Sequence, residues 1–328
     1  MKIAVVGCGA VGSYYGACLT RAGADVHFLL RSDYEAVRTH GVRIHSVHGD
    51  FVAHPRAARH PDEIGPCDAV LIGLKTTAND QFGALLPALT GPDTMLVTLQ
   101  NGLGNEDRLA ALFGPDHVFG GLCFVCLNRT APGVIRHTAH GLVVLGEYRR
   151  PPSARVGVLE HAFRQAGVSC RVAGDLECAH WEKLVWNIPF NGLGVAGVVG
   201  VENVLAGRVP ATVTRRETLP TDELLHEAGW ATLVWELMLE VIAAAQGVGY
   251  PVGEELAGEN LERTRCMGPY KASTLLDYEQ GLPLEVESLF AEPLRRAKSA
   301  GIATPRLEAL CAVLRTLEER RAGGGSPY

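Results

Sequence analysis

The first dozen residues constrain the fold more strongly than any other part of the chain. The apolar, β-branched run at residues 2–6 is followed directly by Gly7-Cys8-Gly9-Ala10-Val11-Gly12. A buried strand, a G-x-G-x-x-G turn and a helix together begin a dinucleotide-binding βαβ unit. Gly7 allows the tight turn, Gly9 lets backbone amides approach a pyrophosphate, and Gly12 lets the helix pack against the strand. The pattern therefore predicts a dinucleotide at the amino end of this helix.

Short apolar runs alternate with helical segments through the first half of the chain. A helix is predicted at 13–22, and further strands at 25–30, 69–73 and 95–99. Strands that alternate with helices form parallel sheets covered on both faces. The segment 133–146 differs, because a glycine separates two short runs, and it predicts an antiparallel hairpin at the sheet edge. We therefore predict an α/β, Rossmann-type doubly wound domain over residues 1–175.

The hydrophobic pattern changes near residue 175. Beyond it, apolar residues recur with a helical period and almost no strand signal remains. The helical stretches span 176–206, 222–247, 254–264, 270–280, 284–300 and 304–321. We predict an all-helical domain at 176–321 and a disordered, glycine-rich tail at 322–328. A chain of 328 residues is long enough for two domains.

Composition argues against several classes of partner. The net charge of −6 gives no basic field for nucleic acid, and no apolar run reaches the length of a membrane span. Nine cysteines, an odd number without a regular framework, favour a reduced cytoplasm. Cys123 and Cys126 form a single C-x-x-C pair, which predicts no metal site on its own. We expect His137 and His140, which flank the predicted hairpin turn, to lie on the surface.

The end of the second strand selects the dinucleotide. Arg31 lies 19 residues past Gly12, where an NAD site carries a carboxylate for the ribose. A guanidinium pairs well with a 2′-phosphate, and its plane can cover the adenine. The sequence therefore favours NADPH over NADH. In the alternative, Arg31 is an ordinary solvated residue and Asp33 binds the ribose.

Polar residues also follow two later strands. Lys75 comes shortly after the run at 69–73, and Asn101 belongs to the Gln-Asn-Gly-Leu-Gly segment after 95–99. Ligands in open α/β sheets bind outside the carboxyl ends of the strands. We expect Lys75 and Asn101 to face the cofactor, although a surface lysine and a turn asparagine would also fit these positions.

The first predicted helix of the second half carries polar residues at helical spacing. In the run WEKLVWNIPFN, Lys183, Asn187 and Asn191 recur every four residues and share one face of an apolar helix. Such a lysine can act as a general acid, although a solvated lysine beside Glu182 is the alternative. Pro189 lacks a backbone donor, which predicts a bend or a looser turn between the two asparagines. We expect that bend to aim Asn191 at a substrate.

Together these motifs resemble those of the ketopantoate reductases (2-dehydropantoate 2-reductases). The resemblance covers nearly the whole chain. In family order it rests on GCGAVG at 7–12, Arg31, LK at 74–75, QNGLG at 100–104, WEKLVWN with Asn191, KAST and LLD at 271–277, and Glu285. It implies a Rossmann-type domain followed by a helical domain of the 6-phosphogluconate-dehydrogenase-like type. It also implies NADPH as cofactor and a small 2-oxo acid as substrate.

The resemblance implies a role for each matching residue. The cofactor would be bound by Gly7, Cys8, Gly9, Ala10, Val11, Gly12, Arg31, Lys75, Asn101, Cys126 and Glu285. The substrate would be bound by Asn101, Asn187, Asn191 and Ser273. Lys183 would be the catalytic proton donor, and Cys126 would contact the cofactor through its backbone. For Ser273 and Glu285 the alternatives are a helix N-cap and a solvated helix face.

Two departures from the family pattern bear on the substrate. The family usually carries another substrate-binding asparagine ten residues after the position of Asn191, and here that residue is Val201. Losing one amide would relax the substrate preference or shift it towards a less polar molecule. The segment 207–230 is longer and more polar than expected, as a lid or a surface excursion would be.

The sequence therefore predicts an NADPH-dependent reductase of 2-oxo acids, with ketopantoate as lead substrate. The alternatives are a related 3-hydroxy acid or polyol-phosphate dehydrogenase and a non-catalytic NADPH-sensing protein. A phosphorylated substrate would need a cationic cluster, for which the candidates are Arg215, Arg216, Arg263 and Arg265. We expect a cytoplasmic enzyme without nucleic-acid or membrane partners, and its amphipathic helices are compatible with a homodimer.

Overall fold

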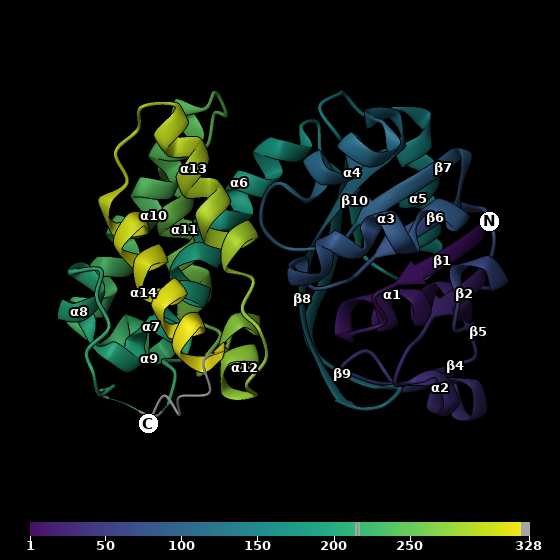
Figure 1. The fold of residues 1–328 in the computed structure, drawn as a ribbon, viewed down its shortest axis with the longest axis horizontal. Coiled ribbons are helices and arrows are strands. Elements are labelled where there is room, and N and C mark those ends of the chain that lie inside the picture. Colours follow the sequence, from purple (N-terminus) through teal and green to yellow (C-terminus); the bar gives the residue numbers. More distant parts are fainter. Residues whose placement is uncertain (214, 216, 323–328) are drawn as a thin grey trace. The chain divides into compact units, whose positions relative to one another are not determined.

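The computed structural model describes residues 1–213, 215 and 217–322, which form two compact units. The first unit spans Met1–Ala179 and the second begins at His180 (Figure 1). The division falls inside helix α6 (Leu176–Asn187), close to the change in hydrophobic pattern. The predicted tail lies outside the described residues, except for Ala322, which ends the last helix.

The first unit is built on a mixed sheet. In the described part of the chain, its strands follow the order β4-β3-β9-β8-β7-β6-β1-β2-β5, and β10 pairs with β9. All neighbours are parallel except the pairs β3–β4 and β8–β9. The strands are β1 (Lys2–Val6), β2 (Asp25–Leu29), β3 (Val42–Ser46), β4 (Phe51–Ala53), β5 (Arg56–Ala58), β6 (Cys67–Ile72), β7 (Thr90–Thr98), β8 (Val118–Ala131), β9 (Val134–Glu147) and β10 (Cys170–Val172).

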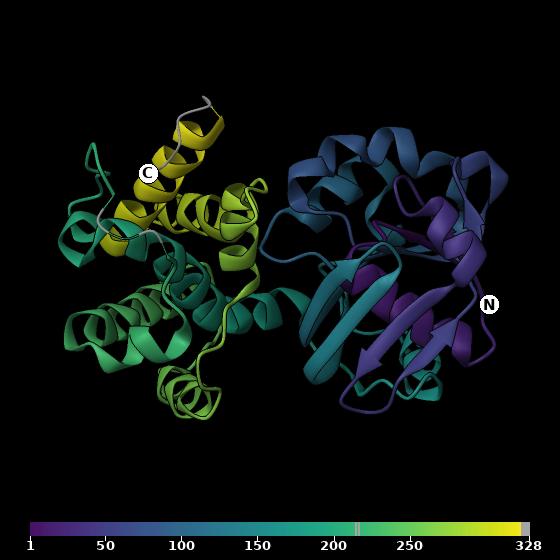
Figure 2. The ribbon, with the colours of Figure 1, turned by 90° about the horizontal axis from the view of Figure 1, so that it is seen from below.

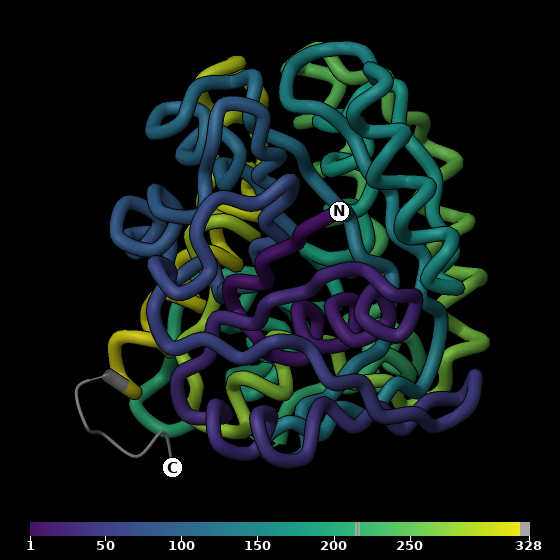
Figure 3. Tube along the Cα trace, turned by 90° about the vertical axis from the view of Figure 1, so that its right-hand side faces the viewer, coloured from purple at the N-terminus to yellow at the C-terminus, as the bar shows by residue number. Residues whose placement is uncertain are grey.

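Strand β1 is buried on both faces of this sheet. Ile3 and Val5 belong to one apolar core, and Ala4 and Val6 belong to the other. This two-sided burial explains the continuous apolar run in the sequence. Figure 3 shows the purple trace that runs from the N-terminus through β1 into α1.

The helices of the unit are α1 (Ala10–Arg21), α2 (Tyr34–His40), α3 (Phe82–Leu85), α4 (Asn105–Phe113) and α5 (Ala154–Gln165), with short turns η1 (Pro61–Glu63), η2 (Thr76–Gln81), η3 (Pro87–Leu89) and η4 (Pro115–His117).

The predicted Rossmann-type fold is confirmed, and the predicted strands and first helix correspond to β1, β2, β6, β7 and α1. The hairpin prediction at 133–146 is wrong. One long strand, β9, runs through the segment and pairs with β8, and the turn between the two lies at Pro132 and Gly133. Figure 2 shows these two strands side by side. Gly141 marks a bulge, because Val125 pairs with His140 but Phe124 pairs with Leu142.

The bulge also explains a second error. His137 was expected on the surface, but it is 1% exposed and holds the bulge from inside. Its Nε2 lies 3.1 and 3.0 Å from the carbonyl oxygens of Ala139 and His140, and its Nδ1 lies 2.8 Å from the hydroxyl of Ser46. Tyr14 Oη is 3.2 Å from the same Nδ1. Burial lowers the pKa of His137, against the opposite effect of the two carbonyls. His140 is exposed, as expected.

Every element described beyond His180 is helical, as predicted (Figure 1). The elements are η5 (Ile188–Leu193), α7 (Gly194–Ala196), η6 (Gly197–Val199), α8 (Val201–Leu205), α9 (Thr221–His226), α10 (Ala228–Gly247), α11 (Glu255–Arg265), α12 (Ser273–Glu279), η7 (Glu287–Ala291), α13 (Glu292–Ser299) and α14 (Pro305–Ala322). The expectation that no apolar run reaches the length of a membrane span is wrong, because helix α10 is long and apolar enough to cross a membrane. Its buried residues, including Leu237 and Met238, belong to the interior of this unit, as in a core helix.

The looser turn expected at Pro189 is confirmed. Helix α6 ends at Asn187 and continues as η5, a π-helical segment that contains the proline. Proline removes one backbone donor and clashes with an α-helical turn, and a wider turn relieves both effects. The two asparagines of the predicted face therefore lie on opposite sides of a change in helical register.

Candidate functional site

The glycine turn of the first unit contains two glycines that the protein itself requires. A Cβ on Gly7 would lie 2.2 Å from the backbone nitrogen of Leu74, and Gly7 has φ +93°. A Cβ on Gly12 would lie 2.3 Å from the carbonyl oxygen of Gly7. Neither contact leaves room for a side chain, because both neighbours are backbone.

Gly9 is different. A Cβ there would meet nothing within 4 Å, and its φ of −75° suits any residue. Neither packing nor conformation in this chain demands glycine at this position. We call the open space at Gly9, beside the first turn of α1, the cradle. It fits a group that approaches the backbone closely, as a pyrophosphate does. Gly9 is also the N-cap of α1 and provides no side chain to satisfy the first amides.

The other residues of the turn support its geometry. Cys8 packs inward, with Sγ 3.5 Å from the carbonyl oxygens of Val5 and Leu29. Burial raises the pKa of its thiol, so the side chain is a neutral packing group. Ala10 and Val11 form the start of α1. The structure thus gathers the predicted residues 7–12 into one turn.

Arg31 and Asp33 have different environments. Arg31 is exposed, two residues beyond β2. The carboxylate of Asp33 accepts hydrogen bonds from Arg129 at 2.9 and 2.5 Å and from the backbone of Gly133 at 3.1 Å. Burial acts to raise the pKa of Asp33, but these bonds and one from Ser32 hold it below its usual value. Asp33 therefore serves the β8–β9 hairpin, which weakens the alternative that it binds a ribose.

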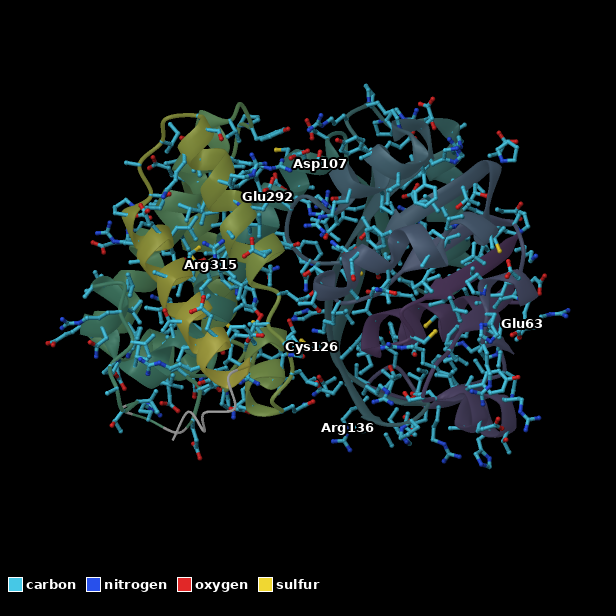
Figure 4. The ribbon with its side chains drawn as sticks, viewed as in Figure 1. Glu63, Asp107, Cys126, Arg136, Glu292 and Arg315 are labelled. Carbon is cyan, nitrogen blue, oxygen red and sulfur yellow. The ribbon has the colours of Figure 1, made fainter. Side chains whose placement is uncertain are left out.

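The remaining predicted residues of this unit lie at or beside strand ends. Lys75 is exposed and precedes η2, and Asn101 is half-buried beyond β7. Strands β6 and β7 are parallel neighbours, so their carboxyl ends lie together. Cys126 is buried on β8 (Figure 4), where its carbonyl oxygen accepts from the hydroxyl of Thr138 at 3.4 Å.

The polar residues of the second unit lie on and just after α6. Lys183 is half-buried, whereas Asn187 and Asn191 are 7% and 3% exposed. The Asn191 amide nitrogen donates to the backbone oxygen of Asn187 at 3.0 Å. Its amide oxygen accepts from the backbone nitrogen of Thr274 at 3.1 Å. The Asn191 amide therefore joins η5 to the first turn of α12.

This contact brings together parts of the predicted set that lie far apart in the sequence. Ser273, next to Thr274, is exposed and is the first residue of α12. The N-cap position belongs to Ala272, so the structure does not support the alternative N-cap role of Ser273. Glu285 lies in the segment that links α12 to η7 and is buried. The alternative that it belongs to a solvated helix face is therefore excluded.

The segment 207–230 is not a detached excursion in its described part. Leu219 is fully buried, and its backbone nitrogen donates to the carbonyl oxygen of Gly194 at 2.8 Å. A Cβ on Gly197 would lie 2.2 Å from the Leu219 side chain, so the glycine makes room for the leucine. The hydroxyl of Thr218 donates to Glu279 on α12 at 2.6 Å. Sequence reasoning missed these anchors, because a single leucine in a polar stretch gives no periodic signal.

Val201 and two of the arginines considered for a phosphate-binding cluster have neighbours within the second unit. Val201 is the half-buried first residue of α8, next to Gly229. Arg215 forms an ion pair with Glu223 at 2.8 Å. Arg263 donates to the side chain of Asn260 at 2.8 Å. Arg216 lies outside the described residues, and Arg265 is exposed at the end of α11.

The sequence matches two family models. The model described as "Ketopantoate reductase PanE/ApbA" matches residues 3–150, and the model of the family's C-terminal part matches residues 210–318. The second match includes nearly all of the segment 207–230, so most of that segment lies within the family's own region. The 2-dehydropantoate 2-reductase of Nostoc sp. is 39% identical over 330 residues, which include 98% of this chain and 97% of that protein.

Solved structures show the same likeness. The 2-dehydropantoate 2-reductase of Geobacter metallireducens has a TM-score of 0.87 and 44% identity, and the match covers 96% of this chain and 99% of that one. A D-mandelate dehydrogenase solved with NADH and anilino(oxo)acetate has a TM-score of 0.84 and covers 98% of this chain and 99% of that one. Its identity is 18%, so it indicates a shared fold alone.

Proposed function

Because the chain belongs to the ketopantoate reductase family, we propose that it reduces ketopantoate to pantoate with NADPH. The observation that carries the proposal is the hydrogen bond from Thr274 to Asn191. It joins Asn191, in the segment that continues α6, to the first turn of α12, which begins at Ser273, although Asn191 and Thr274 are 83 residues apart in sequence. The ammonium of Lys183, the amides of Asn187 and Asn191 and the hydroxyl of Ser273 are donors of the kind that an oxygen-rich acid needs.

The glycine turn and Arg31 would hold the cofactor. The open cradle at Gly9 suits the pyrophosphate, and the exposed guanidinium of Arg31 suits a 2′-phosphate. Asp33, the carboxylate that would favour NADH, is engaged by Arg129. These contacts support NADPH over NADH. Lys75, Asn101 and Cys126 follow or lie on adjacent strands and would border the nicotinamide side.

Reduction of a 2-oxo acid needs a proton at the carbonyl oxygen and donors for the carboxylate. Bound NADPH supplies the hydride. Lys183 would protonate the oxygen as it becomes an alkoxide. Asn187 and Ser273 would donate to substrate oxygens. Asn191 would contribute the second N–H of its amide nitrogen, because only one is used for the carbonyl of Asn187.

Two further roles complete the proposal. Glu285 would lie near the cofactor ribose and the catalytic lysine. Val201 would leave the far end of the substrate with one amide fewer than relatives provide, so turnover should extend to less polar 2-oxo acids.

The nine cysteines all carry free thiols, which supports a cytoplasmic location.

The test is NADPH oxidation with ketopantoate and a panel of 2-oxo acids, 3-hydroxy acids with NADP⁺, and sugar phosphates. We expect Lys183→Ala to lower kcat by about 10³-fold, since general-acid catalysis contributes on this order. Binding of NADPH, followed by its fluorescence, should be retained. Lys298→Ala is the matched control, because Lys298 is an exposed residue that pairs with Glu308 in the same unit.

The outcomes separate the alternatives. Undiminished turnover in Lys183→Ala would exclude this residue as the acid. Turnover of a 3-hydroxy acid or a sugar phosphate, without ketopantoate activity, would instead identify a related dehydrogenase. NADPH binding without turnover of any compound in the panel would indicate a non-catalytic sensor.

A further inference from the structure

Three buried amide side chains meet at the carboxyl ends of β6 and β7, and the proposed reaction does not yet use them. Gln100 follows β7, Asn79 lies in η2, and Asn105 is the first residue of α4. They are 5%, 6% and 0% exposed. Burying an amide is costly unless it is hydrogen-bonded, and an apolar residue would fill the same volume more cheaply.

The amides form one continuous chain of hydrogen bonds. The hydroxyl of Thr98 donates to Gln100 Oε1 at 2.9 Å, and Gln100 Nε2 donates to Asn79 Oδ1 at 2.8 Å. Asn79 Nδ2 then donates to Asn105 Oδ1 at 2.8 Å. We call Thr98, Gln100, Asn79 and Asn105 the amide network.

The network ends on two backbone carbonyls. Gln100 Nε2 also donates to the oxygen of Leu74 at 3.0 Å, and Asn105 Nδ2 donates to the oxygen of Asn101 at 3.1 Å. A carbonyl oxygen can only accept, so both ends require an amide nitrogen. Turning any one amide over would place oxygen against oxygen or nitrogen against nitrogen. The network therefore has a single direction and fixes the distance between its ends.

Those ends adjoin the two residues proposed to border the nicotinamide. At one end, the accepting carbonyl is that of Leu74, which directly precedes Lys75. At the other end, the accepting carbonyl is that of Asn101 itself. Asn79 also lies in the turn that begins after Lys75, whose carbonyl accepts from the backbone of Ala78 at 2.9 Å. A shift of the segment 74–79 relative to the segment 100–105 would stretch the bonds of Gln100 to Leu74 and Asn79 and the bond of Asn79 to Asn105.

We propose that the amide network is a positioning device that holds Lys75 and Asn101 in mutual register at the nicotinamide side of the cofactor. This inference rests on the proposed function. The residues of the network act through Lys75 and Asn101 and make no contact with reacting atoms. Misplacement by about 1 Å is enough to cost a large part of a catalytic rate, so a rigid second layer has a measurable role.

The decisive comparison uses two threonines of β7. The hydroxyl of Thr98 donates one bond to Gln100 and accepts one from its backbone nitrogen at 3.3 Å. The hydroxyl of Thr94 likewise donates to the oxygen of Cys67 at 2.6 Å and accepts from the nitrogen of Gly91 at 2.8 Å. Both are at most 2% exposed. Thr98→Val and Thr94→Val therefore remove equivalent bonds, inside and outside the network.

We expect Thr98→Val to lower kcat about threefold and Thr94→Val to leave it unchanged, although both lower the melting temperature. Asn79→Asp keeps the side-chain shape but replaces the donor to Asn105 with an acceptor, and we expect it to lower kcat about tenfold. The Kd for NADPH should rise only about twofold in Asn79→Asp, because the glycine turn provides most of the binding.

The inference is overturned if Thr98→Val keeps the kcat of the wild type, or if Thr94→Val loses as much as Thr98→Val. If Asn79→Asp does not fold, the two threonine variants decide alone. Failure of the proposed function is a separate result, since the wild type would then not turn over ketopantoate. In that case, nicotinamide fluorescence of bound NADPH, compared between Thr98→Val and Thr94→Val, still tests the network.

Discussion

The two units present their candidate residues by different means. In the first unit, backbone geometry creates the cradle, and the neighbours that forbid a side chain at Gly7 and Gly12 are themselves backbone atoms. In the second unit, side chains would carry the proposed chemistry, and Gly197 makes room for the side chain of Leu219 rather than for backbone. A site made by backbone depends on local sequence, whereas a site made by side chains depends on contacts across the fold.

This difference has a consequence for tolerance to mutation. Backbone atoms cannot move aside without displacing a strand or a loop, so the turn of the first unit should be intolerant at two of its glycines. Side chains can adopt other rotamers, so the second unit should lose function gradually as its contacts are removed. Three predictions test this contrast, from the largest effect to the smallest.

The largest effect is expected at Gly7. Gly7→Ala should destabilise the first unit by more than about 4 kcal/mol, because the new Cβ would overlap Leu74 at a positive φ. Gly9→Ala should change stability by less than about 0.5 kcal/mol but weaken NADPH binding about tenfold or more, because its Cβ occupies the cradle. Urea denaturation and fluorescence titration measure the two effects. Equal destabilisation by both variants would remove the distinction between packing glycines and the cradle glycine.

An intermediate effect is expected at Asn191. Asn191→Ala should cost about 2–3 kcal/mol, since it leaves the buried backbone nitrogen of Thr274 without this acceptor. The kcat/KM for ketopantoate should fall about 30-fold, because the first turn of α12 is no longer held. Asn203 is a matched control, because its amide also donates to the carbonyl four residues earlier, that of Val199, at 2.8 Å.

The control should separate stability from function. We expect Asn203→Ala to destabilise the second unit by about 1 kcal/mol and to leave kcat/KM unchanged. Steady-state kinetics with thermal denaturation of both variants is the measurement. If both variants lost activity in proportion to stability, the role of Asn191 would be general packing.

The smallest effect is expected at His137, where the first unit also depends on a side chain. Burial lowers the pKa of His137, so the native state prefers the neutral ring and the unfolded state binds the proton more readily. Its contribution to stability is present above the pKa of the unfolded state and is lost as the pH falls below it. His137→Gln should remove this dependence. Between pH 7.5 and 5.5 the melting temperature of the wild type should therefore fall about 3 °C further than that of the variant. A parallel fall in both proteins would contradict this explanation.

The sequence allowed most of the first unit to be predicted, for reasons that the structure makes plain. Strand β1 and the glycine turn are determined by burial on both faces and by close backbone contact, which leave a strong local signature. The failure at β9 has an equally physical cause. Gly141 resembles a turn glycine in sequence, but in the sheet it accommodates a bulge, and only pairing with β8 distinguishes the two.

The candidate site of the second unit was only partly predictable. Helical spacing placed Lys183 and Asn187 on one face, and the proline correctly indicated a looser turn. The partner of Asn191 is Thr274, which no local rule could identify across 83 residues. The buried amide network at Gln100 was missed for a similar reason, because three isolated amides in different elements show no periodic pattern.

The wide turn of η5 has a consequence for how this family can change. An α-helix advances by about 100° per residue, so the loss of one residue before Asn191 in η5 would restore an α-helical turn and rotate the residues beyond it by about that angle. Asn191 would then face away from α12. The π-helical turn therefore sets the rotational phase between the lysine and the later helices. A relative that differed by one residue in this segment would present a different arrangement of donors on the same fold.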